Sequence, residues 1–474
     1  MKLRQLSKED VMFLAGETET TFQHTGGLVL LNSEDSPDFC FESFRQTSIE
    51  RIELVPNFHW KLHQVPMGID RPYWIEDEDF SYDHHIKRIA VPSPGDHAAL
   101  AEVVSHLYAK HLDRDHPLWE MWLIEGLEGG KFAILQKLHH CMMDGQGGNK
   151  LGEIMCDLEP NPPPREIDRA ITEAKAGRVP TRRERSTQAM KNLSRLPTEL
   201  VKGMYDLARP KMMEQLSLER RPKKSKVVVP SASFNTNISK HRGFIFGSLC
   251  LDDIKMIKNY FDVSLNDVVL ALVSGAMRSY MIDQENLPEE SLRTTIAVSL
   301  RSEDDDAIVN KVTNASITMA TNESDPVERL KKINAESREV KDEVSSGAMG
   351  AMEVFQTLPP FMLSALMGIM KGEQIPQMMG SNLIVSNVRG SHFPLFLAGV
   401  KMESMYPMSI ISDGIPVNFT CISYVDKIDL GVTVEPKLFP NAWSIMDKLQ
   451  ESLEEYMRLA GAPQKRARKG TTKT

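Results

Sequence analysis

The chain has 474 residues and a formal net charge of −9, with 41% hydrophobic and 26% charged residues. This length exceeds what a single hydrophobic core organises, so the composition predicts a globular protein of two domains. The negative charge argues against nucleic acid as a partner. Five scattered cysteines without a Cys-x-x-Cys pair favour reduced thiols over a disulfide framework.

Residues 1–160 carry helical and strand patterns that we expect to form an N-terminal domain. Ser7, followed three residues later by Asp10, is typical of a helix start and predicts a helix over residues 6–14. Apolar runs predict a strand over 22–31, and apolar residues at helical spacing predict a helix over 98–112. Two more strands, joined by a glycine turn, end in a pair of histidines and place them at a hairpin edge.

The stretch His139-His140-Cys141-Met142-Met143-Asp144-Gly145 follows an apolar run that is typical of a buried strand. Successive side chains on a strand point to opposite faces, so one histidine can face a cavity while its neighbour packs behind it. Gly145 allows a turn through positive φ directly after the acid. Two histidines and an aspartate therefore meet where a strand ends.

Residues 161–228 are polar and rich in Lys and Arg, and we expect a crossover linker that is partly helical. Residues 229–474 restart with strand and helix patterns and predict a C-terminal domain with a basic tail. Ser264 and Asp267 predict the start of a long apolar helix, and Asp325-Pro326 predicts another. Strands and helices mix without strict βαβ alternation, which indicates two α/β or α+β layers.

Several blocks together resemble the bacterial wax ester synthase/diacylglycerol acyltransferase family of the CoA-dependent acyltransferase superfamily. The histidine block resembles its His-His-x-x-x-Asp-Gly signature, and three further blocks keep the order of the family's other motifs: Pro117-Leu118-Trp119, Ser264-Leu265-Asn266-Asp267 and Ser386-Asn387-Val388-Arg389-Gly390. Arg389 stands where the family has proline. The block Ala297-Val298-Ser299-Leu300-Arg301 also departs from a related family pattern.

This resemblance implies two chloramphenicol-acetyltransferase-like sandwich domains with the active site at their interface. It implies transfer of a long-chain fatty acyl group from acyl-CoA to a fatty alcohol, to diacylglycerol, or to both. His140 is then the general base, because a neutral imidazole with a pKa near ~6.5 can take a hydroxyl proton. His139 is supporting, and no acyl-enzyme is required because the substrates meet in a ternary complex.

The remaining site residues have roles that are open or structural. Asp144 either orients the imidazole, as in a triad, or pairs structurally with Arg301 across the interface. Asn266 either helps to stabilise an oxyanion or belongs to a helix cap with Asp267. The residues expected to shape the substrate tunnel or to bind substrate are Pro117, Leu118, Trp119, Ser386 and Asn387.

Other chemistries fit the sequence less well. There is no Gly-x-Ser-x-Gly nucleophile elbow, and adjacent strand histidines diverge, so we expect no metal at His139, His140 and Asp144. No cofactor is expected, since acyl-CoA is a substrate. The alternatives are an acyltransferase of the same superfamily with a carrier-protein donor, and a lipid-droplet-binding protein without turnover.

The sequence has no stretch of about 18 uninterrupted apolar residues, and its N-terminus lacks the apolar core of a secretory signal. We therefore expect a cytoplasmic protein that associates peripherally with the inner membrane face or with lipid inclusions. Two segments are candidates for that contact: the apolar residues 361–370, which can equally form a buried helix, and the basic residues 465–469.

Overall fold

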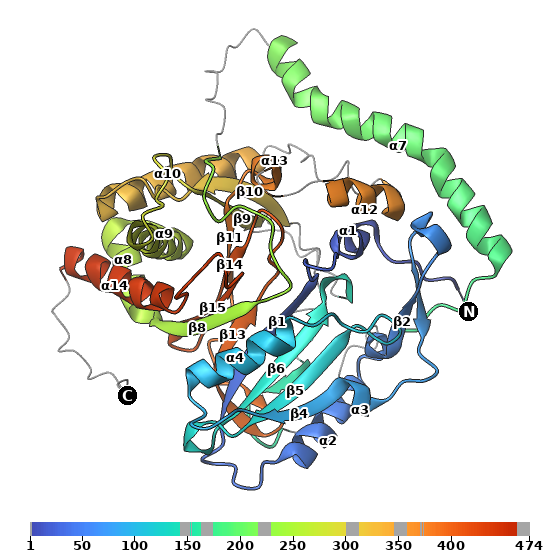
Figure 1. Cartoon of the computed structure of the whole chain (residues 1–474), viewed down its shortest axis with the longest axis horizontal. Helices are drawn as coiled ribbons and strands as arrows, with labels where there is room; N and C mark the ends of the chain where they lie inside the picture. The colour runs from blue at the N-terminus through green and yellow to red at the C-terminus, as the bar shows by residue number, and fades with distance from the viewer. Residues whose placement is uncertain are drawn as a thin grey trace.

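The computed structural model describes residues 2–142, 152, 154–162, 174–216, 229–299, 312–345, 358–369, 372 and 374–461. It confirms a mixed α/β architecture built on two large sheets, which lie side by side with helices packed around them (Figure 1). A two-stranded hairpin of β2 (Trp60–His63) and β3 (Tyr73–Glu76) forms a third, small sheet.

The first sheet has seven strands, and most of them come from the N-terminal third of the chain. Its order is β4 (Ile86–Ala90), β5 (Trp119–Glu125), β6 (Phe132–His139), β1 (His24–Asn32), β13 (Val400–Met408), β12 (Phe396–Leu397) and β7 (Cys156–Asp157). The helices of this part are α1 (Lys8–Gly16), α2 (Phe41–Ile52), α3 (Tyr82–His85) and α4 (His97–Tyr108). Strand β6, which ends at His139, lies inside this sheet. The expectation of a hairpin edge is therefore wrong, because β1 pairs with the other side of β6 and sets His24 opposite His139.

The second sheet has six strands from the C-terminal half. Its order is β10 (Val312–Thr318), β9 (Arg293–Ser299), β11 (Leu383–Val388), β14 (Val417–Tyr424), β15 (Lys427–Val434) and β8 (Gly243–Cys250). Four helices belong to this part: α8 (Leu251–Phe261), α9 (Leu265–Asp283), α10 (Pro326–Ser345) and α14 (Ser444–Leu459). Helix α9 is buried along most of its length in the largest hydrophobic cluster, which explains its unbroken apolar sequence.

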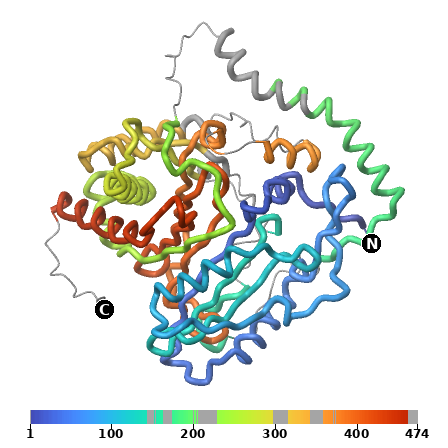
Figure 2. The backbone as a smooth tube through the Cα atoms, in the orientation of Figure 1, coloured from blue at the N-terminus to red at the C-terminus, as the bar shows by residue number. Residues whose placement is uncertain are grey.

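Strands β12 and β13 connect the two sheets, because the C-terminal half donates them to the first sheet. Strand β13 pairs with β1 in antiparallel register and also packs against β14 and β15 of the second sheet. The approach is so close that a Cβ atom on Gly431 of β15 would lie 1.9 Å from the carbonyl oxygen of Pro407. Figure 2 shows the orange backbone of this C-terminal segment crossing to the blue and cyan strands.

Local capping rules explain where three helices begin. The Ser7 hydroxyl accepts the Asp10 N–H at the start of α1, and Ser264 and Asp267 form a reciprocal capping box at the start of α9. Asp325 Oδ1 accepts the backbone N–H groups of Val327 and Glu328 at the start of α10. These three predicted helix starts are confirmed.

Two helices stand apart from the sheets. One is α7 (Arg182–Leu216), which has 35 residues and arches over the side of the molecule that carries α1 (Figure 1). The other is α12 (Pro360–Ile369), on that same side, and the short α13 (Gln374–Met379) follows it in the chain. Among the described residues, no single helix is long and apolar enough to cross a membrane. Helices α8 and α9 meet that criterion only as a pair bent by 105°.

Candidate active site

Two backbone hydrogen bonds hold the paired histidines at the end of β6. The N–H of His139 donates to the Leu118 carbonyl at 2.9 Å, and the N–H of His140 donates to the Gln23 carbonyl at 2.8 Å. Strand β6 ends at His139, and a short 3-10 turn η4 (His140–Met142) begins at His140. The residues on both sides of β6 therefore fix the position of each histidine.

His140 lies under helix α1. Its ring stacks on Phe13 with a centroid distance of 3.8 Å and an interplanar angle of 14°. Burial lowers the pKa of His140 to about 4; the backbone hydrogen bond at His140 partly offsets this effect, while the neighbouring His139 adds to it. At neutral pH the imidazole is therefore uncharged, which is the protonation state that a general base requires. Its Nδ1 is buried and has no hydrogen-bond partner among the described residues.

His139 contacts an ionic network at the C-terminal end of α1. Its Nδ1 accepts the Cys141 N–H at 3.1 Å, so the ring proton is on Nε2, which lies 3.7 Å from Glu17 Oε2. The Glu17 side chain is only 5% exposed and also contacts Arg114 Nε at 3.0 Å and His111 Nδ1 at 2.9 Å. Burial alone would raise the pKa of Glu17, but His139 and Arg114 together hold it well below its ordinary value.

Glu17, Arg114 and Phe13 were not among the site residues predicted from the sequence. Arg114 lies three residues before Pro117 of the Pro-Leu-Trp block, and this position is the one signal that could have marked it. Glu17 follows α1 in a stretch of threonines and acids that looks like an exposed loop. Its burial results from packing against the end of β6, and the local sequence carries no sign of that contact.

The Pro117-Leu118-Trp119 block lies beside the histidines, at the start of β5. Leu118 and Trp119 are each 1% exposed, and the Leu118 carbonyl is the group that holds His139. The Trp119 Nε1–H donates to the Phe58 carbonyl at 2.8 Å, so its only ring donor is satisfied inside the protein. This block packs as part of the wall behind the histidines.

The other predicted site residues lie in the second sheet and its helices. Asp267 accepts the Ser264 N–H at 3.0 Å and the Asn334 side-chain amide at 2.8 Å, so it acts as part of the α9 cap. Asn266 is half-buried in the first turn of the same helix. Ser386 and Asn387 are half-buried on β11, which pairs with β14 in parallel.

Asp144, Gly145 and Arg301 lie outside the described residues. The expected pairing of Asp144 with Arg301 stays a prediction.

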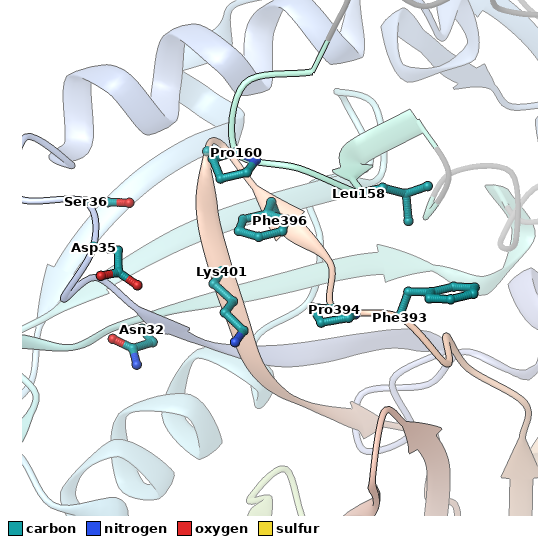
Figure 3. Close-up of a pocket in the computed structure, with 10 residues that line it drawn as sticks. Asn32, Asp35, Ser36, Leu158, Pro160, Phe393, Pro394, Phe396 and Lys401 are labelled. Atoms are coloured by element: carbon teal, nitrogen blue, oxygen red, sulfur yellow. The ribbon is translucent and has the colours of Figure 1, made fainter.

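One pocket in the described part of the chain lies beside the histidine site, and another lies far from it. A pocket of about 390 Å³ lies between α1, the turn η2 (Pro66–Gly68) and α12, and its lining includes Ala15, Arg114 and Phe361. It therefore borders the helix that covers His140. A pocket of about 580 Å³, lined by Asn32, Lys401 and Phe393 among others, is shown in Figure 3. Asn32 ends β1, eight residues from the His24 that faces His139, so this pocket is roughly 27 Å along the strand from the histidines.

Comparison with known proteins identifies the family of the chain. The wax ester synthase/diacylglycerol acyltransferase catalytic domain matches residues 6–269, and the C-terminal domain of the same family matches residues 309–457. The O-acyltransferase WSD of Acinetobacter baylyi is 30% identical, with 96% of this chain and 97% of that protein covered. A putative diacylglycerol O-acyltransferase of Mycobacterium tuberculosis is 29% identical, with 96% and 90% covered.

Solved structures show the same fold. The wax ester synthase/diacylglycerol acyltransferase of Marinobacter aquaeolei has a TM-score of 0.71 at 27% identity, covering 97% of this chain and 100% of that one. A starter condensation domain of rhizomide synthetase has a TM-score of 0.53 at 11% identity, covering 97% and 95%, and supports the fold alone. The chain belongs to the wax ester synthase/diacylglycerol acyltransferase family of O-acyltransferases.

Proposed function

We propose that this enzyme transfers a long-chain fatty acyl group from acyl-CoA to the hydroxyl of a fatty alcohol, of diacylglycerol, or of both. The observation that carries the proposal is the state of His140, a largely covered imidazole that is neutral at pH 7 and held by its backbone. The names of the relatives supply the substrate class, since they are wax ester synthases and diacylglycerol acyltransferases.

The proposed reaction runs in a ternary complex with His140 as general base. The neutral imidazole takes the proton of the acceptor hydroxyl while its oxygen attacks the thioester carbonyl. The tetrahedral intermediate then collapses, the C–S bond breaks, and the imidazolium returns the proton to the CoA thiolate. The ester and free CoA leave, and the histidine is again neutral. Proximity of the two bound substrates supplies much of the rate.

Other residues support this chemistry without exchanging protons. Glu17 and Arg114 hold His139, and His139 fixes the strand end from which His140 projects. In this proposal Asp144 is structural and pairs with Arg301, with Gly145 providing the turn that follows. Asn266 is proposed to stabilise the oxyanion from the first turn of α9, where the helix dipole also favours negative charge.

We also propose that the enzyme works at a membrane or lipid-inclusion surface, because its substrates are found there. Helix α12 supports this proposal. It is apolar along its length, yet Phe361, Met362 and Ile369 are exposed, Ile369 at 76%. The pocket beside it leads toward α1, the helix that covers His140.

Ester formation by the purified protein tests the proposed function. Palmitoyl-CoA is supplied with hexadecanol or with a diacylglycerol, and the product is identified by mass spectrometry. We expect wax ester, triacylglycerol, or both, together with an equal amount of CoA. If ester forms only when the acyl group is loaded on a carrier protein, the donor is misassigned. If no ester forms with either donor, the protein is a lipid-binding member of the family.

A further inference from the structure

A second cluster of chemically active side chains lies outside the histidine site. His84 is on α3, and Asp113 and His116 lie in the loop between α4 and β5. One nitrogen or carboxylate oxygen from each residue can be chosen so that all three atoms lie within 4.8 Å of one another. The rings of His84 and His116 have a centroid distance of 4.1 Å. None of the three takes part in the proposed acyl transfer.

His116 is oriented by a buried carboxylate behind it. Its Nδ1–H donates to Asp77 Oδ2 at 3.1 Å, and the Asp77 side chain is fully buried. The other oxygen, Asp77 Oδ1, accepts Lys61 Nζ at 2.7 Å and the Asp79 N–H at 3.2 Å. Because Nδ1 carries the proton, the lone pair of His116 is on Nε2. Imidazoles that bind metals are typically oriented in this way by a carboxylate on the far ring nitrogen.

The other two residues are also placed to accept an ion. Asp113 is exposed, and its Oδ1 accepts the Asp115 N–H at 2.9 Å. His84 is half-buried, and its imidazole ring makes no hydrogen bond to any residue that the structure describes. Two imidazole nitrogens and a carboxylate oxygen thus converge from two elements that are far apart in sequence.

We propose that His84, Asp113 and His116 bind a divalent transition-metal ion of the zinc type, with water completing the coordination shell. Imidazole and carboxylate suit zinc, whereas calcium and magnesium prefer all-oxygen sites. Tetrahedral ligands at zinc distances lie about 3.4 Å apart, so the farthest pair must approach by at most about 1.4 Å. The exposed side chain of Asp113 can rotate by this amount.

The ion would act as a structural clamp. It would tie α3 to the loop between α4 and β5, and the same loop carries Arg114, which pairs with Glu17 beneath His139. The inference does not depend on the acyltransfer mechanism, because it concerns metal binding by the free enzyme.

The test is isothermal titration of the untagged, chelator-treated full chain with ZnCl₂, CoCl₂ and MgCl₂. We expect one zinc ion per chain, weaker binding of cobalt and no binding of magnesium. His84→Ala and His116→Ala should each weaken zinc binding by at least about 10-fold. His106→Ala, which removes an exposed histidine from α4, is the matched control and should bind as the wild type does.

Asp113→Asn keeps this experiment decisive if a histidine variant folds poorly, because Asp113 is exposed and its replacement is nearly isosteric. Zinc should raise the Tm of the wild type and of His106→Ala, and raise it less in Asp113→Asn. The proposal is overturned if the wild type binds no zinc, or if the three ligand variants bind zinc as tightly as His106→Ala.

Discussion

The acid limb of the pH–rate profile gives the sharpest prediction, because burial makes His140 a much weaker base than an exposed histidine. The pKa of His140 is lowered to about 4, against an ordinary value of about 6.5. At pH 5.5 an imidazole with a pKa of 4 is about 97% neutral, whereas one with a pKa of 6.5 is about 9% neutral. We therefore expect kcat/KM to be nearly equal at pH 5.5 and 7.5, where an unshifted histidine would lose about tenfold.

The direction of the pH dependence follows from the protonation state of His140 that catalysis requires. The neutral form is active, so activity is retained while the pH stays above the pKa of the folded enzyme and is lost as the pH falls through about 4. The value of kcat/KM reports the free enzyme, which is the state that the structure describes. Ester formation from radiolabelled acyl-CoA is the suitable assay, since thiol reagents react slowly in acid. Circular dichroism at each pH separates loss of the base from unfolding.

A variant at Phe13 tests the cause of the shift. Phe13→Ala uncovers one face of the His140 ring, so the pKa of His140 should rise toward its ordinary value. Activity at pH 5.5 should then fall several-fold relative to pH 7.5. Phe393→Ala, in the distant pocket of Figure 3, is the matched control and should keep the wild-type profile. The reasoning is refuted if kcat/KM of the wild type already falls near pH 6.5, or if Phe13→Ala leaves the pH of this fall unchanged.

The remaining predictions concern stability and positioning. Arg114→Ala should lower the unfolding free energy by about 1–3 kcal/mol more than Glu17→Gln does, because it leaves the buried Glu17 carboxylate without its closest cation, whereas the glutamine removes the charge itself. Urea unfolding measures both variants, and equal losses of stability would contradict this role of Arg114. Gly431→Ala should cost about 1–3 kcal/mol or more, since its Cβ would lie 1.9 Å from the Pro407 oxygen and force β13 and β15 apart; an unchanged urea midpoint would show that the strands are farther apart. Asp267→Ala should lower stability by about 1 kcal/mol through loss of the α9 cap. Asn266→Ala should instead lower kcat with little change in Tm. A lower Tm with unchanged kcat would show that Asn266 has a structural role.

Local sequence rules predicted the elements well where the controlling contacts are close in the chain. The Ser264–Asp267 capping box and the Asp325-Pro326 start lie within one turn of the helices they begin, so their pattern is complete in the sequence. Residues 229–474 were expected to contain strands, and β14 and β15 are two such strands, both largely buried.

Partners that meet from distant parts of the chain could not be predicted in the same way. Strands were expected in residues 229–474, but nothing in the sequence pattern indicates that β13 pairs with β1 in the first sheet. Glu17 has the sequence context of a solvated loop and becomes buried only when the end of β6 packs against it. The cluster of His84, Asp113 and His116 likewise forms only after α3 meets the loop that leads into β5.

The most direct test of the central claim is CoA release by wild-type enzyme and by His140→Ala, with palmitoyl-CoA and each acceptor. The account predicts acceptor-dependent release by the wild type that falls by about 10²–10⁴-fold in the variant, while palmitoyl-CoA binding and Tm are retained. The exposed His241→Ala should behave as the wild type. Release by His140→Ala at the wild-type rate would contradict the assignment of His140 as the general base.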